Sequence, residues 1–224
     1  MNLLLISALV ALFVSPWSTQ SPEVSQPAKP PAPVNGASHS NELGFSFSMP
    51  PDWEVQDTEP MLPVVQQQAA KSATHEQEKK AVGCTQIPLK ATHGDPASNV
   101  VVVGVSYDCL GQHFTDSDLA SFGSGVANSL KKNWNLVDPK YGAYALGTHS
   151  VWIERAAGSP TAHPETRRTL EVVCGMLKKG AVCWMAFVAS DADLRAFEQS
   201  QVSLDGEPPV ALVPQSALAK KPGM

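Results

Sequence analysis

Apolar and polar residues alternate along several stretches of this chain. Between residues 43 and 49 the apolar side chains fall on every second position, which is typical of a strand with one buried face. Apolar and β-branched runs between turn residues predict further strands, over residues 82–91, 99–107, 143–146, 149–157, 168–177 and 181–188. Turn formers at residues 93–96 and the tight Lys178-Lys179-Gly180 hairpin connect neighbouring strands, so we expect the sheet to be antiparallel.

A helical spacing replaces the alternation after residue 115. Thr115 and Asp118 match a capping box, in which a hydroxyl at the helix start is followed three residues later by an acid. The apolar stripe that follows has spacings of three and four residues and comprises Leu119, Phe122, Val126, Leu130 and Trp134. Shorter helices are expected over residues 63–73 and after a second capping box at Ser190, whereas residues 76–80 are expected to be solvated.

These elements predict an α+β fold. We expect a single antiparallel sheet with one main amphipathic helix and one or two shorter helices packed on it. The composition, with 43% hydrophobic and 17% charged residues, is that of a globular protein. The net charge of -5 argues against nucleic acid as a partner, because binding to phosphates favours a basic surface.

The first forty residues differ from the rest of the chain. Residues 3–14 form an apolar run that is too short to cross a bilayer as a helix, and a Ser-Pro segment follows it, as in a secretory signal. Prolines and small residues then dominate, which predicts an extended spacer. We therefore expect a signal peptide over residues 1–18, a Pro-rich disordered linker over 19–40, a globular α+β domain over 41–206 and a flexible C-terminal tail over 207–224. The expected location is secreted or periplasmic, with no membrane span in the mature chain.

The chain has four cysteines, Cys84, Cys109, Cys174 and Cys183. An even number in an oxidising compartment favours two disulfides, with free buried thiols as the alternative. Zinc is disfavoured, because the gaps of 24 and 8 residues are longer than those between paired zinc ligands. Cys174 and Cys183 lie opposite each other if the hairpin turn between them is two residues wide, whereas a three-residue loop shifts the pairing by one. Cys84 and Cys109 fall near the same end of a longer hairpin, so we expect Cys84–Cys109 and Cys174–Cys183.

Catalytic motifs in the sequence are partial. Ser129 and Lys132 fit the S-x-x-K spacing of penicillin-recognising enzymes, but the K-T-G segment that this chemistry needs is missing from the sequence. Both residues also suit the surface of an amphipathic helix. The six histidines do not fall at a metal-ligand spacing. We therefore expect no catalytic residue, no cofactor and no metal site, and Ser129 with Lys132 remains the candidate of the enzyme hypothesis.

Both ends of the predicted domain resemble one known fold. Residues 45–53 fit an F-x-F-x-x-P-x-x-W opening, and the chain closes with a strand and a short helix that carries Leu194, Phe197 and Ser200. This arrangement resembles the PsbP-like fold of photosystem II extrinsic proteins and related small bacterial envelope lipoproteins. The chain is also similar to uncharacterised secreted bacterial proteins. The resemblance implies an antiparallel sheet with packed helices and a binding or assembly role, and it carries over no functional residue.

Two functional hypotheses follow from these observations. The first is a secreted or periplasmic binding or assembly module, not catalytic, whose partner is an unknown envelope protein or small ligand. The alternative is an envelope hydrolase whose site is assembled only in three dimensions. A binding module should expose an apolar patch or an uncovered sheet edge, whereas an enzyme should enclose at least two ionisable groups with shifted pKa values.

Overall fold

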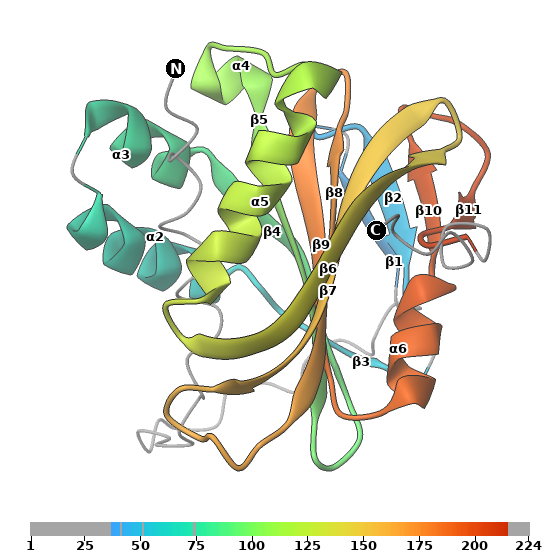
Figure 1. Ribbon diagram of the computed structural model, residues 1–224. Coiled ribbons are helices and arrows are strands. Elements are labelled where there is room, and N and C mark those ends of the chain that lie inside the picture. Colours follow the sequence, from blue (N-terminus) through green and yellow to red (C-terminus); the bar gives the residue numbers. More distant parts are fainter. Residues whose placement is uncertain (1–36, 41, 51, 74, 215–224) are drawn as a thin grey trace, which may run out of the picture.

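The computed structural model describes residues 37–40, 42–50, 52–73 and 75–214 (Figure 1). In these residues the strands form two separate sheets, of seven and four strands, and every strand pair is antiparallel. The α+β class is as expected, but the expectation of a single sheet is wrong. The central strands of the large sheet are apolar on both faces, so each face needs a cover. Helices cover one face, and the small sheet with one helix covers the other (Figure 1).

The large sheet has the strand order β3-β4-β5-β9-β8-β7-β6. Its strands are β3 (Glu54–Gln56), β4 (Thr85–His93), β5 (Ser98–Ser106), β6 (Trp134–Leu146), β7 (His149–Pro160), β8 (Arg168–Met176) and β9 (Gly180–Val188). β9 is buried at every position, which fits its place at the centre of the sheet. β6 is the long edge strand, and a register shift interrupts its pairing with β7 between Val137 and Lys140.

The small sheet joins the two ends of the domain. It contains β1 (Ala37–Ser40), β2 (Phe45–Ser48), β10 (Gln201–Leu204) and β11 (Val210–Ala211). β1 falls within the expected linker and β11 within the expected tail, and Leu212 and Val213 beyond β11 are buried. Strand pairing therefore extends beyond residues 41–206 at both ends. The expected signal peptide and most of the expected linker lie outside the described residues.

The helices follow the capping signals in the sequence. They are α2 (Met61–Ser72), α3 (Glu76–Gly83), α4 (Tyr107–Leu110), α5 (Leu119–Leu130) and α6 (Asp191–Glu198), with a 3-10 turn at Asp116–Asp118 before α5. The Thr115 amide donates to Asp118 Oδ2 over 2.9 Å, and the Asp193 amide donates to Ser190 Oγ over 3.1 Å. Both predicted capping positions are therefore occupied as the sequence indicated. No helix among the described residues is long and apolar enough to span a membrane.

Residues 76–80 are solvated, as the sequence predicted: all except half-buried Glu78 are exposed, and they form the first part of α3. Glu78 accepts the His75 amide at the helix start, and Lys79 pairs with Glu76 over 2.7 Å. One local prediction about the main helix is wrong. Trp134 does not continue the stripe of the main helix: α5 ends at Leu130, and Trp134 begins β6 instead. Its indole packs on Phe187 of the sheet, with ring centroids 5.2 Å apart.

Candidate functional site

The four cysteines form the two expected pairs, Cys84–Cys109 and Cys174–Cys183. Cys174 and Cys183 are register partners on β8 and β9, and only 0% and 3% of their surfaces are exposed. Cys109 lies in α4 and is exposed, whereas its partner Cys84, at the end of α3, is 6% exposed. The first bridge therefore joins two surface helices, and the second lies inside the sheet.

A surface cleft of about 630 Å³ lies against the Cys84–Cys109 bridge, and we call it the cysteine cleft. Its lining residues are Glu42, Leu62, Gln66, Gly83, Cys84, Thr85, Gln86, Ser106, Asp108, Cys109 and Lys179. A volume of this size is typical of sites that bind small molecules or short peptide segments. The cleft is the strongest candidate site in the described part of the chain.

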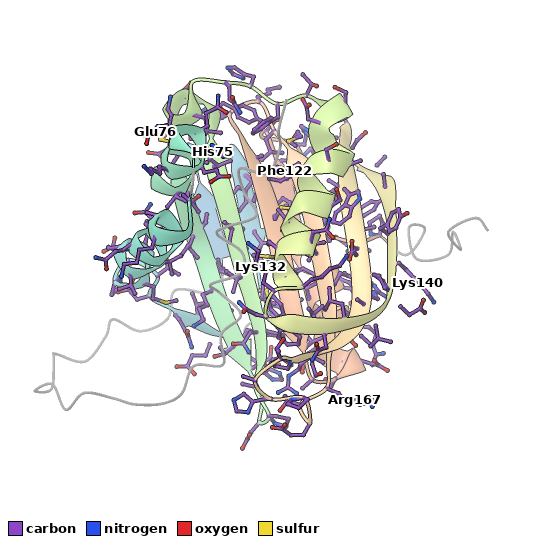
Figure 2. The ribbon with its side chains drawn as sticks, turned by 60° about the vertical axis from the view of Figure 1, so that its left-hand side comes forward. His75, Glu76, Phe122, Lys132, Lys140 and Arg167 are labelled. Atoms are coloured by element: carbon purple, nitrogen blue, oxygen red, sulfur yellow. A yellow bond between two sulfur atoms is a disulfide. The ribbon has the colours of Figure 1, made fainter. Side chains whose placement is uncertain are left out.

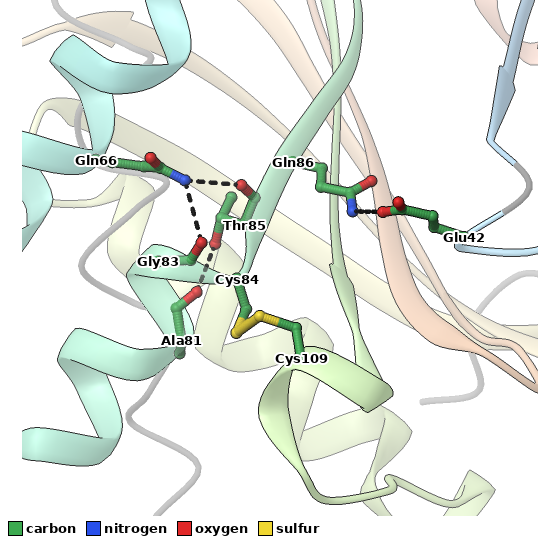
Figure 3. The surroundings of a disulfide bond; sticks show 8 residues. All are labelled: Glu42, Gln66, Ala81, Gly83, Cys84, Thr85, Gln86 and Cys109. Carbon is green, nitrogen blue, oxygen red and sulfur yellow. Dashed lines mark hydrogen bonds between the residues drawn. A yellow bond between two sulfur atoms is a disulfide. The ribbon is translucent and has the colours of Figure 1, made fainter.

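Side-chain amides shape the cleft on both sides of β4 (Figure 3). Gln66 of α2 donates from Nε2 to the carbonyl oxygens of Gly83 and Thr85, over 3.3 and 3.1 Å. On the other side, Gln86 donates from Nε2 to a carboxylate oxygen of Glu42. The two contacts hold α2 and the segment before β2 at fixed positions beside the first residues of β4.

Among the described strands, the first residues of β4 pair on one side only, and we call this side the open edge of β4. β3 pairs with β4 only opposite residues 90–92, while β5 pairs with β4 from Thr85 onward. The Gln66 amide therefore occupies the Thr85 carbonyl at a place where a further strand would otherwise bind. The Thr85 side chain is held by α3, since its hydroxyl donates to the Ala81 carbonyl over 2.9 Å. The cleft thus combines fixed main-chain acceptors with polar side chains that have rotatable ends.

Both signs of charge line the cleft. Its lining residues include the acidic Glu42 and Asp108 and the basic Lys179, which lies in the turn between β8 and β9. A ligand that matches this lining carries hydrogen-bond donors and acceptors together with positive and negative charge. A peptide chain has this combination of groups.

The structure does not place Ser129 and Lys132 as a catalytic pair. Ser129 is 1% exposed, and its hydroxyl donates to the Val126 carbonyl of the same helix over 2.6 Å. Lys132 is exposed and lies beyond the end of α5 (Figure 2). The S-x-x-K spacing places the serine hydroxyl and the lysine amine one turn apart only when both residues lie in the same helix. Here α5 ends between Ser129 and Lys132. Neither residue lines the cysteine cleft.

A cluster of charged groups lies on the opposite face of the large sheet, against α6. Arg155 donates from Nε to Glu171 over 2.6 Å and also binds Glu198. Burial raises the pKa of Glu171 to about 7, although Arg155 opposes this shift, and burial also raises the pKa of Glu198. These carboxylates pair with a guanidinium inside the domain, so they do not face the cysteine cleft.

A second polar network joins β5 to α6. The Asp193 carboxylate accepts hydrogen bonds from Ser98 over 2.6 Å and from Ser190 over 2.9 Å, and it lies 2.8 Å from His93 Nδ1. Burial opposes ionisation of Asp193, but these hydrogen bonds hold its pKa below the usual range. Because Ser98 donates to the carboxylate and not to the imidazole, the order differs from a Ser-His-Asp relay. The network instead fixes the start of α6.

Metal binding has no support in the described part of the chain, which contains no group of three or more His, Cys, Asp or Glu side chains arranged to hold an ion. Sequence reasoning identified only Cys84 and Cys109 among the cleft residues. Glu42, Gln66 and Lys179 come from three separate segments, and each is an ordinary surface residue when the sequence is read alone.

No protein-family model and no curated protein matches this sequence. The chain is similar to the solution structure of cyanobacterial PsbP (CyanoP) from Synechocystis sp. PCC 6803, with a TM-score of 0.37 and 11% sequence identity over 76% of this chain and 89% of that chain. This weak similarity corresponds to the weak PsbP-like resemblance stated from the sequence. This similarity gives no functional role to any residue of the cysteine cleft.

Proposed function

We propose that this chain is a secreted or periplasmic binding module that holds a polar peptide segment of an envelope partner in the cysteine cleft. The observation that carries the proposal is the cleft itself, about 630 Å³ in volume and lined by acidic and basic residues and two side-chain amides. Such a lining suits a ligand that offers peptide groups and both charges. The role is to hold the partner, without chemical change to it.

The open edge of β4 supports a peptide as the ligand. Extended peptides bind proteins by adding to an exposed strand edge, with main-chain hydrogen bonds for affinity and side-chain contacts for specificity. At Gly83 and Thr85 the protein already presents carbonyl oxygens that bind an amide, that of Gln66. A peptide N–H group is chemically equivalent to this amide and could replace it.

The positions of the reactive groups favour binding over hydrolysis. The Ser129 hydroxyl is held by its own helix, and the carboxylates with raised pKa values, Glu171 and Glu198, are bound by Arg155 on the other face of the sheet. General acid–base catalysis requires such groups to reach a substrate. The cleft residues instead suit recognition by hydrogen bonds and charge.

Two disulfides support an extracytoplasmic location, because cysteines form stable bridges mainly in oxidising compartments. We propose that residues 1–18 act as a signal peptide and that the following Pro-rich segment tethers the domain. The apolar run at residues 3–14 supports this assignment. The packed domain would then be displayed in the envelope with the cysteine cleft available to a partner.

Site-specific photo-crosslinking tests the proposal. Benzoylphenylalanine replaces Asp108, an exposed residue of the cleft, and as a matched control it replaces Ser121, an exposed residue of α5 outside the cleft. After irradiation of cells that produce the full chain, we expect a discrete protein adduct at position 108 whose attachment point maps to one segment of the partner. Equal adducts at both positions, or an adduct of small-molecule mass at position 108, would contradict the proposal.

A further inference from the structure

We propose that the Cys84–Cys109 bridge is a site of thiol–disulfide exchange, opened in the folded protein by the dithiol of an envelope redox protein. Cys174–Cys183 is then a permanent structural bridge. This inference goes beyond the proposed binding role, because it depends on access to sulfur and not on the identity of any cleft ligand. The inference gives the cysteine cleft a second kind of reactant, the thiolate of a redox protein.

Access separates the two bridges. A thiolate must reach one sulfur of a disulfide directly, so exposure decides which bridge exchanges without unfolding. Cys109 is exposed, and both Cys84 and Cys109 line the cysteine cleft. Cys174 and Cys183 are 0% and 3% exposed. Like Cys84, they belong to the apolar cluster beneath α5, so Cys109 is the exposed member of the four cysteines. Only the first bridge offers a sulfur to an incoming protein.

The charges in the cleft bear on the same step. Lys179 is a basic residue of the cleft lining, and positive charge favours a thiolate over a thiol. Glu42 and Asp108 line it as well and oppose an incoming negative charge. Because the cleft carries both positive and negative residues, its charges favour a redox protein with a complementary surface. The exposure of the cysteines alone decides which of the two bridges can be attacked.

The fold around the bridge does not depend on it. The bridge closes a loop of sequence separation 25 that contains the β4–β5 hairpin. The hairpin has its own ladder, from Thr85 opposite Val105 to His93 opposite Ser98, with a register shift between Gln86 and Leu89. α4 is anchored separately, since Tyr107 is 2% exposed and its hydroxyl lies 3.4 Å from Met176 Sδ. Opening the bridge therefore releases the α3–α4 link and leaves both elements attached.

The exchange can be written as two displacements. A thiolate of the redox protein attacks Cys109 Sγ, the Cys84–Cys109 bond breaks, and the electron pair leaves on Cys84 Sγ, which takes up a proton from water. The second thiolate of the redox protein then attacks its own sulfur in the mixed disulfide, and Cys109 leaves as a thiolate and is protonated. The net change reduces this bridge to two thiols and oxidises the dithiol to a disulfide.

Reduction under native conditions tests the inference, with dithiothreitol as the dithiol probe. The full chain is incubated without denaturant, quenched with iodoacetamide at increasing times, and mapped by peptide mass. We expect Cys84 and Cys109 to be alkylated at least about tenfold faster than Cys174 and Cys183, and faster than global unfolding measured by tryptophan fluorescence. The double variant Cys84→Ala/Cys109→Ala is the control, in which the remaining bridge should resist reduction until denaturant is added.

The point of attack has its own test. In Cys84→Ser the remaining Cys109 thiol should react readily with dithiobis(nitrobenzoate), whereas Cys84 in Cys109→Ser should react at least about tenfold more slowly because it is buried. Equal reduction rates for the two bridges, earlier reduction of Cys174–Cys183, or reduction of Cys84–Cys109 only at the rate of global unfolding would overturn the inference. None of these outcomes depends on whether a peptide binds the cleft.

Discussion

The two faces of the seven-stranded sheet are stabilised in different ways. The face under α5 is filled mainly by apolar side chains, with buried Glu154 of β7 as a carboxylate on the same face. Gly123 of the helix approaches the Trp152 ring so closely that an added Cβ would overlap the ring. The face under α6 and the small sheet has an apolar centre at Trp184, with Phe45 packed edge-on at 5.6 Å between ring centroids. Around that centre lie the Arg155 and Asp193 networks.

This difference shows that one sheet can combine two kinds of core. Stability on the α5 face depends on shape and volume, because close-packed apolar groups cannot adjust to a lost side chain. Stability on the α6 face also depends on protonation, because its buried carboxylates need their partners. The cysteine cleft lies where the helical layer ends beside β4, and so it belongs to neither packed face. Three variants should separate the two faces.

Phe122→Ala should have the largest effect. Phe122 points from α5 into the core and is 4% exposed, so its removal leaves a cavity that should lower the free energy of unfolding by about 3–5 kcal/mol (Figure 2). Lys131→Ala, at an exposed position directly after the helix, should change it by less than about 0.5 kcal/mol. Guanidinium denaturation measures both, and a larger loss in Lys131→Ala would mean that the helix face is misassigned.

Arg155→Met should have the next largest effect, and it probes the α6 face. Glu171 is 0% exposed, so removal of its partner leaves a buried carboxylate without compensation and should cost about 2–4 kcal/mol at pH 8. The double variant Arg155→Met/Glu171→Gln should regain part of this loss, since the uncompensated charge is gone. Arg167→Met, at an exposed loop position, is the matched control and should be nearly neutral. An equal loss in the single and double variants would exclude the charge-based explanation.

The smallest expected effect is a change in pH dependence. Burial raises the pKa of Glu171 from 4.5 to about 7 in the folded state, so folding favours the protonated form. The contribution of Glu171 to the free energy of unfolding is therefore full below about pH 4.5, and it is lost as the pH rises through about 7. Glu171→Gln should therefore lose less stability than the parent chain between pH 5 and 8, whereas exposed Glu59→Gln should keep the parental slope. Parallel slopes for the parent and Glu171→Gln would contradict this assignment.

The sequence predicted the elements whose signals are local. Capping residues located the starts of α5 and α6, and turn residues located the β8–β9 hairpin and hence Cys174 opposite Cys183. The small sheet was not predictable in this way. Its central strand pair, β2 with β10, joins residues from opposite ends of the domain sequence, such as Phe47 and Val202. Strand alternation does not identify the partner of a strand.

Edge positions were also hard to predict. β6 extends over Trp134–Leu146, but only residues 143–146 had a strand pattern, because Asp138, Pro139 and Lys140 interrupt the alternation. Such residues are common on edge strands, where they hinder pairing with other chains. The cysteine cleft was missed for a similar reason. Its polar residues are exposed and come from separate segments, so only the tertiary structure brings them to Cys84 and Cys109.

The central claim is that the cysteine cleft holds a polar peptide, and the affinity of that peptide tests it most directly. The partner segment mapped by crosslinking at position 108 is synthesised, and its binding is measured by calorimetry with the parent chain, Lys179→Glu and the control Lys132→Glu. Because Lys179 lines the cleft and Lys132 does not, we expect Lys179→Glu to weaken binding by about tenfold or more and Lys132→Glu to leave it unchanged. Equal affinity in all three proteins, or a loss confined to Lys132→Glu, would contradict the account.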